Sequence, residues 1–138
     1  MPNMVILSPD IVAFRLDRMR FEAAVEAHFG ADAKLVPRAD ETSPYDVVAQ
    51  ITRPGQPFFQ VFRFRKNDGL VTDGTPEQAV EVALWARSLL PDDPDGRIWM
   101  VDEGYNGHVE LAPGMTAEAI RTSWVDHAES APDDQPRG

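Results

Sequence analysis

The sequence predicts a single-domain α+β protein: a mostly antiparallel sheet of about five to six strands, with about three helices packed on one face. Two observations support this class. Segments of alternating apolar and polar residues cluster between residues 45 and 72, with turns between them. Segments with apolar residues three and four apart precede and follow that cluster. No internal repeat interrupts this order, so one layered domain is expected.

Along the chain, an apolar strand at residues 4–7 precedes a helix at 15–29, where apolar residues recur every three or four positions. Gly30 suits the left-handed residue that follows a helix end. A short strand is expected at 34–37. The segment 45–53 alternates, which places Tyr45, Val47, Ala49 and Ile51 on one face and Asp46, Val48, Gln50 and Thr52 on the other.

The best strand signal lies at residues 58–66, before a turn and a short return strand at 70–72. Its alternation separates two sets of side chains. One face carries Phe58, Gln60, Phe62 and Phe64, and the other carries Phe59, Val61, Arg63 and Arg65. On the sheet face left free by the helices, we expect Gln50, Thr52, Arg63 and Arg65 to meet the polar side of the later hairpin.

Two further helices carry local start signals. Thr75, Pro76 and Gln78 form the pattern of a capping box with proline at the first helical position, and this helix should run to about residue 90. Thr116 caps a last helix, which the pattern extends to about residue 127. Residues 1–129 should form the globular domain, and residues 130–138, rich in proline and acid, a disordered tail.

Composition limits the compartment and the partners. The chain of 138 residues has no cysteine, which excludes disulfides and thiolate metal sites. Its longest apolar runs are far short of a membrane span, and no signal peptide is visible, so we expect a cytoplasmic protein that does not enter the membrane. A net charge of −10 disfavours duplex nucleic acid and favours, if anything, a basic partner.

The segment 98–111 predicts a β-hairpin around Asn106-Gly107, a pair typical of a two-residue type I′ turn. In that register Tyr105 pairs with His108, and Glu103 pairs with Glu110. One face then carries Ile98, Met100, Val109 and Leu111, and the other Trp99, Val101, Glu103, Tyr105, His108 and Glu110. A bulge at Gly104 would instead turn Asp102 outward.

Two facing carboxylates and an imidazole at Glu103, His108 and Glu110 could bind a divalent metal or act as an acid–base pair. The simpler interpretation is a solvated hairpin end, in which Tyr105 and His108 stack across the strands. Arg63, Arg65 and Lys66 form the basic cluster of this acidic chain. It could bind a carboxylate or phosphate, but we favour cross-strand pairing with Glu103 or Glu110.

The leading functional hypothesis is a non-enzymatic protein-binding protein, of an inhibitor or immunity type, without a cofactor. Its contact surface would be the outer sheet face, where an exposed tryptophan beside tyrosine and charge resembles an interface hot spot. The candidate contact residues are Trp99, Glu103, Tyr105, His108, Glu110, Arg63 and Arg65. A homodimer through this face is compatible. The alternatives are a small metal-dependent or acid–base enzyme at Glu103/His108/Glu110, and a small-molecule domain with a pocket lined by Phe58, Phe62 and Phe64.

Overall fold

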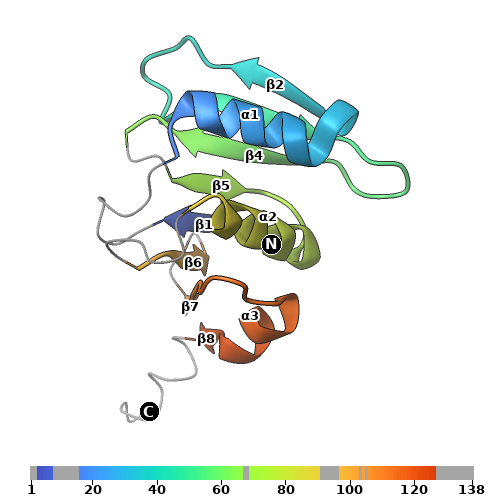
Figure 1. Cartoon of the computed structure of the whole chain (residues 1–138). Helices are drawn as coiled ribbons and strands as arrows, with labels where there is room; N and C mark the ends of the chain where they lie inside the picture. Colours follow the sequence, from blue (N-terminus) through green and yellow to red (C-terminus); the bar gives the residue numbers. More distant parts are fainter. Residues whose placement is uncertain are drawn as a thin grey trace, which may run out of the picture.

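A computed structural model describes residues 3–7, 16–66, 69–90, 97–102, 104 and 106–126. Eight strands form one sheet in which every neighbouring pair is antiparallel, accompanied by three α-helices (Figure 1). The predicted α+β class is confirmed, but the sheet is larger than the five to six strands expected. The predicted tail at 130–138 lies outside the described residues.

The helices and strands do not alternate along the chain, because four strands follow one another between the first two helices. They are β1 (Met4–Leu7), α1 (Arg18–Phe29), the 3-10 turn η1 (Gly30–Asp32), β2 (Ala33–Pro37), β3 (Tyr45–Ile51), β4 (Phe59–Phe64), β5 (Leu70–Thr72), α2 (Pro76–Ser88), β6 (Trp99–Asp102), β7 (Gly107–Glu110), α3 (Ala117–Ser123) and β8 (Val125–Asp126).

The N-terminal strand lies inside the sheet and joins its two halves. The spatial order is β2-β3-β4-β5-β1-β6-β7-β8, so β1 is inserted between the meander β2–β5 and the strands β6–β8. Val5 pairs with Val71 on one side and with Val101 on the other. Both halves of the sheet therefore depend on β1 for their connection.

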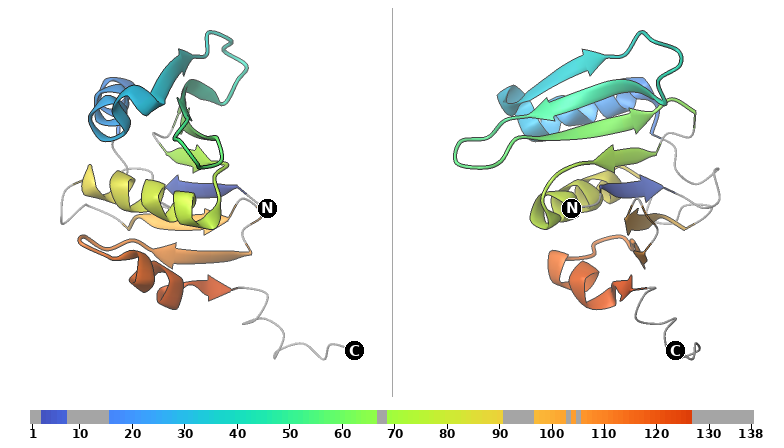
Figure 2. Two further views of the ribbon diagram at one scale, coloured as in Figure 1. Left: turned by 90° about the vertical axis from the view of Figure 1, so that its right-hand side faces the viewer. Right: turned by 180° about the vertical axis from the view of Figure 1, so that it is seen from behind.

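The helices share one core with one face of the sheet. Buried residues of α1, α2 and α3, such as Phe21, Ala83 and Ile120, belong to the same apolar cluster as Val47 and Val61 of the sheet. Seen from behind, α1 and α2 lie on the far side of the strands (Figure 2, right). Within the described residues, every helix is too short or too polar to span a membrane.

Local signals set the helix starts. The Thr75 hydroxyl accepts a hydrogen bond from Gln78 N, and the Gln78 side chain accepts one from Thr75 N, which completes the predicted capping box. The Thr116 hydroxyl caps α3 through Ala119 N. The first helix begins three residues later than predicted, at Arg18, because the Asp17 carboxylate caps it by accepting from Arg20 N.

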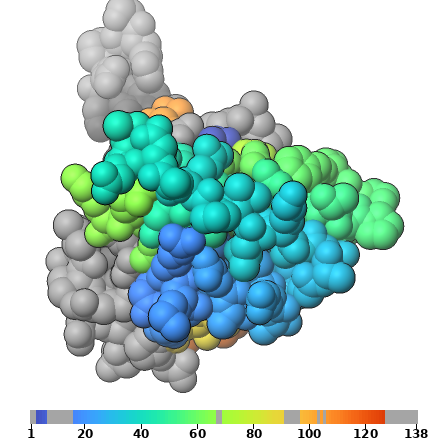
Figure 3. Space-filling view, turned by 90° about the horizontal axis from the view of Figure 1, so that it is seen from above, coloured from blue at the N-terminus to red at the C-terminus, as the bar shows by residue number. Residues whose placement is uncertain are grey.

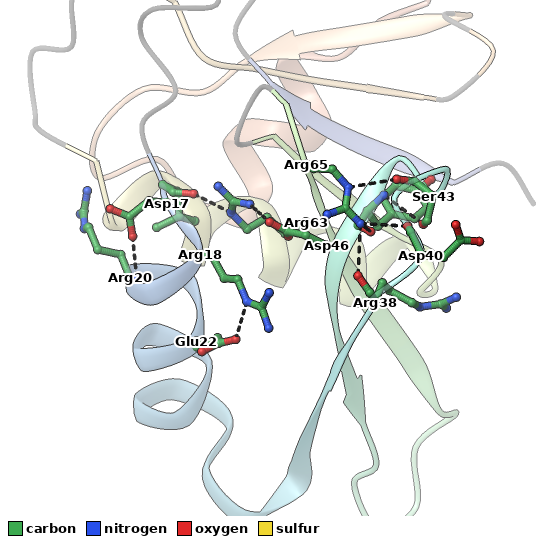
Figure 4. Close-up of polar contacts among 12 residues, drawn as sticks. Asp17, Arg18, Arg20, Glu22, Arg38, Asp40, Ser43, Asp46, Arg63 and Arg65 are labelled. Atoms are coloured by element: carbon green, nitrogen blue, oxygen red, sulfur yellow. Dashed lines mark hydrogen bonds and ion pairs between the residues drawn. The ribbon is translucent and has the colours of Figure 1, made fainter.

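A bulge in β3 changes which residues face the helices. Tyr45 pairs with Phe64 and Val47 with Arg63, so Asp46 is the extra residue between them. The Asp46 carboxylate accepts a 2.6 Å hydrogen bond from Arg63 Nη1, and Arg63 Nε donates to the carbonyl of Leu16 (Figure 4). Arg63 is only 4% exposed. The prediction that it lies on the free face is therefore wrong: it lies on the helix side of the sheet.

A second ion network connects α1, α2 and the segment after β3. Both guanidinium nitrogens of Arg53 donate to the Glu81 carboxylate, at 2.7 and 2.8 Å. His28 Nε2 lies 2.9 Å from Glu81 Oε2. The hydrogen bonds from Arg53 hold the pKa of Glu81 below its ordinary value, against the effect of burial, with His28 contributing further.

The last helix is shorter than predicted, because it ends at Ser123 and not near residue 127. Trp124 follows in an extended conformation, and its indole lies directly over the Cα of Gly107. The chain then forms β8, in which Val125 pairs with His108 and Asp126 with Gly107. A tertiary contact between Trp124 and a glycine therefore ends the helix and adds an unpredicted strand.

Replacing Glu81 by glutamine should lower the free energy of unfolding by about 1 kcal/mol near neutral pH, because the partly exposed Arg53 loses its counter-ion. Since the pKa of Glu81 is lowered in the folded state, its stabilisation is present above the ordinary pKa of 4.5 and is lost as the pH falls through the folded value. Urea unfolding between about pH 7 and about pH 3 should show the two proteins converging. Glu26→Gln, an exposed change on α1, should have no such effect, and a pH-independent difference would contradict the prediction.

A methyl group at Gly107 would collide with the Trp124 indole. Gly107→Ala should therefore destabilise the protein by about 1–3 kcal/mol. In a Trp124→Leu background the same change should cost much less, because the obstacle is gone. A double-mutant cycle in urea measures this coupling, and strictly additive effects would show that the two residues do not meet.

Candidate functional site

The sheet face opposite the helices carries a continuous row of side chains, one from each of the eight strands. Successive residue pairs run across the sheet from β2 to β8 in a single register. We call this set the outer row: Val36, Val48, Phe62, Val71, Val5, Val101, His108 and Val125. Seven of its members are apolar, so the row forms an apolar band across the full width of the sheet.

The centre of the outer row is packed like a core, although the described helices lie on the other face. Val48 is 0% exposed, Val71 1%, Val101 6% and Val5 8%. The partly buried rings of Tyr45, Phe62, Phe64 and Trp99 pack against the valines of β1, β5 and β6. A second, smaller apolar cluster therefore lies on the outer face of this sheet.

Two aromatic groups flank the central valines. On β3 and β4, the ring of Tyr45 lies 4.9 Å from that of Phe62 and 5.3 Å from that of Phe64. On β6 and β7, Trp99 and His108 stack with centroids 4.6 Å apart and planes at 17°. The Trp99 indole nitrogen is buried and has no hydrogen-bond acceptor. A buried donor without an acceptor is costly.

Charge is scarce on this face. Among the described strand positions that share the face of the outer row, only Lys34 and Glu110 carry a full charge; Glu110 Oε1 lies 3.8 Å from the exposed Arg97. Gln50 and Gln60 supply neutral polar groups beside Lys34. On a chain of net charge −10, such a face is unusually neutral.

Three of the predicted contact residues lie together on this face. Trp99 pairs with Glu110, and His108 stacks on Trp99 from the neighbouring pair. Glu103 and Tyr105 lie outside the described residues. The predicted separation of the hairpin into an apolar face with Met100 and Val109 and an outer face with Trp99, Val101, His108 and Glu110 agrees with the observed pairing.

The predicted register of the hairpin, however, is wrong. His108 pairs with Val101 and Glu110 with Trp99, whereas the two-residue turn required Tyr105 and Glu103. Residues 103–106 connect the strands, and Asn106 N donates to the Asp102 carboxylate within this connection. Gly107 is a strand residue and does not have the positive φ of a type I′ turn. The Asp102 side chain accepts this hydrogen bond, and the Asn106-Gly107 pair alone does not predict it.

The basic residues Arg63 and Arg65 do not pair with Glu110, the one of the two predicted hairpin carboxylates that the structure describes. Arg63 pairs with Asp46 on the helix side, and Glu110 has Arg97 nearby. The Arg65 guanidinium donates to backbone carbonyls of Arg38, Asp40, Ser43 and Tyr45 (Figure 4). These hydrogen bonds connect the loop between β2 and β3 to the end of β4. The two segments lie side by side in Figure 3. The favoured cross-strand pairing with Glu103 or Glu110 is therefore not observed for the described partners.

The described residues support neither the alternative metal site nor the alternative pocket lined by phenylalanines. Within the described part of the chain, no group of three His, Asp or Glu side chains could hold a metal ion. The predicted pocket behind Phe58, Phe62 and Phe64 is not formed as expected. Phe62 and Phe64 belong to the outer cluster, and Phe58 is 54% exposed, while Phe59 and Val61 face the helices.

Sequence reasoning missed Tyr45, Val5 and Val71 as parts of this face, whereas it placed Val48 with Gln50 and Val101 with Trp99. Tyr45 was assigned to the side of Val47, and the bulge at Asp46 moves it to the side of Phe62. The valines were visible as members of alternating strands, but only the strand order aligns them. The insertion of β1 next to β5 and β6 is what makes the row continuous.

The middle of the outer row should respond to substitution as a core does. Val71→Thr places a hydroxyl without a partner between Val5 and Phe62 and should cost about 1–3 kcal/mol of stability. The same change at Val125, which is 43% exposed at the edge, should stay within about 0.5 kcal/mol. Thermal and urea unfolding of both variants measure the two losses of stability. Equal losses would show that the middle of the outer row is not packed.

No family model matches the chain, and neither a curated protein nor a solved structure matches it. What this chain does is therefore inferred from its own residues.

Proposed function

We propose that this is a non-enzymatic protein-binding protein that uses the outer face of its sheet to contact a partner with a positively charged surface. The observation that carries the proposal is the pair of partly exposed aromatic groups, Tyr45 with Phe62 and Phe64 and Trp99 with His108, which flank the buried centre of the outer row on a face with few charges. Partly exposed apolar side chains that are rimmed by polar residues are typical of a protein interaction site. Tryptophan and tyrosine, both present here, are the residue types enriched at interface hot spots.

The dimensions of the face suit such a contact. Eight strands with a spacing of about 4.8 Å span about 34 Å from β2 to β8. A standard interface buries about 800 Å² on each partner, which corresponds to a patch of about 30 Å across. The sheet is therefore wide enough to hold one such patch.

Net charge favours a different protein over a second copy. Two chains of charge −10 repel each other, whereas a basic partner is attracted and guided to the surface. Because the outer face itself is nearly uncharged, the acidic groups around it would act on the rate of association, and the apolar face would hold the complex. This division suits an inhibitor or accessory subunit.

The test compares matched variants of the full chain as bait in lysate of the native host, followed by affinity measurement with the purified partner. Trp99→Ala and Val125→Glu alter the outer face, while Met19→Glu places the same charge on α1, at a side chain that is 80% exposed. We expect a one-to-one complex whose affinity falls about tenfold or more with Trp99→Ala and with Val125→Glu. Met19→Glu should bind like the original chain.

Salt and self-association complete the test. The association rate with the partner should fall as salt rises, because the steering is electrostatic. Failure to isolate a stoichiometric partner, or equal losses with Met19→Glu, would overturn the proposal. Light scattering that shows a dimer dissociated by Val125→Glu would also overturn it and assign the face to a second copy. Thermal melts of each variant establish that the loss of binding is not loss of folding.

A further inference from the structure

A cavity of about 420 Å³ opens on the opposite side of the molecule, between α2 and α3. Its apolar wall consists of Val80, Leu84 and Trp85 on α2 and Ala117 on α3. This volume lies in the range of small-molecule sites, which combine an apolar wall with a few polar groups. The outer face does not include any of these residues, so the cavity is separate from the proposed protein contact.

The polar side of the cavity is held rigidly. The His28 ring lies 5.9 Å from the Trp85 ring at an angle of 27°, and its Nε2 bonds to Glu81. Arg53 in turn binds both oxygens of Glu81, which fixes the carboxylate. Because Nε2 is occupied by Glu81, the Nδ1 atom of His28 is the ring nitrogen left for another partner. The stack and the carboxylate together preorganise this imidazole.

The cavity has an excess positive charge only when the His28 ring is protonated, because its arginines and carboxylates balance. Arg53 neutralises Glu81, so this pair contributes little net charge. Arg121 of α3 also lines the cavity, and it makes no ion pair with any described residue. Glu77, at the start of α2, is the one further carboxylate among the lining residues. Ser88 is occupied, because its hydroxyl donates to the carbonyl of Trp85.

We propose that this cavity binds a small apolar monocarboxylate. Its hydrocarbon or aromatic body would pack on Val80, Leu84 and Trp85, while its carboxylate would accept hydrogen bonds from Arg121 and from Nδ1 of a protonated His28, whose Nε2 donates to Glu81. A guanidinium and an imidazole are both good partners for a carboxylate, and Arg binds it with two parallel hydrogen bonds. Glu77 opposes this charge, and the site therefore recognises a single carboxylate and not a dianion.

The proposal is tested by NMR titration of the full chain with 3-phenylpropionate, and with 3-phenylpropanamide as the uncharged analogue. Among the three tryptophans, the indole signal of Trp85 should shift together with the His28 ring, while that of Trp99 stays in place. A ligand of this size should saturate with a Kd of about 1 mM, and the amide should bind about tenfold more weakly.

Two variants that each remove one charge should act in opposite directions. Arg121→Gln should weaken the carboxylate about fivefold or more and leave the amide unchanged, whereas Glu77→Gln should strengthen the carboxylate. Arg97→Gln, the same change at an exposed arginine of the sheet, should have no effect. A lack of saturation at about ten times the expected Kd, equal binding of acid and amide, or indifference to Arg121→Gln would overturn the proposal. Shifts centred on Trp99 would overturn it as well.

Discussion

The ion pair between Arg63 and Asp46 organises the middle of this molecule. Its two side chains are 5% and 12% exposed, and in such surroundings a charge is tolerated only when it is paired and hydrogen-bonded. Arg63 meets this condition by binding Asp46 and the carbonyl of Leu16 at once, which joins β4, β3 and the entry to α1. The carboxylate reaches the helix side because Asp46 occupies the bulge, and the same bulge moves Tyr45 to the outer side.

The two faces of the sheet consequently have different chemistry. The helix side carries a large apolar core together with the Arg63–Asp46 pair, and the network of Arg53, Glu81 and His28 borders it. The outer side carries valines, aromatic rings and few charges. A ligand on the helix side would meet fixed, oriented polar groups, whereas a ligand on the outer side would meet a broad surface with few charges. These differences favour a small molecule on one side and a protein on the other.

How much of the fold and of the outer face the sequence could predict depends on how far apart in the sequence the interacting residues lie. The helix starts at Thr75 and Thr116 were predictable, because capping involves residues three positions apart. The alternation of β4 was also predictable, since period two is a local property. The bulge at Asp46 was not, because its partner Arg63 is distant in sequence. The strand β8 was not predictable for the same reason, because it follows from the contact of Trp124 with the distant Gly107. The hairpin register is a different case: the contact of Asp102 with Asn106 is local, but the Asn106-Gly107 signal does not include it. Strand order, which creates the outer row, is likewise a long-range property.

The central place of β1 has a consequence for how the chain acquires its fold. Val5 is made well before its sheet neighbours Val71 and Val101, which lie far along the chain. The meander β2–β5 can form from local hairpins, but β1 must remain without its sheet partners until then. Contacts between residues so far apart make folding slow, because the loop between them must be closed first. Pairing of β1 is therefore expected to be a late, cooperative step that closes both halves of the sheet together.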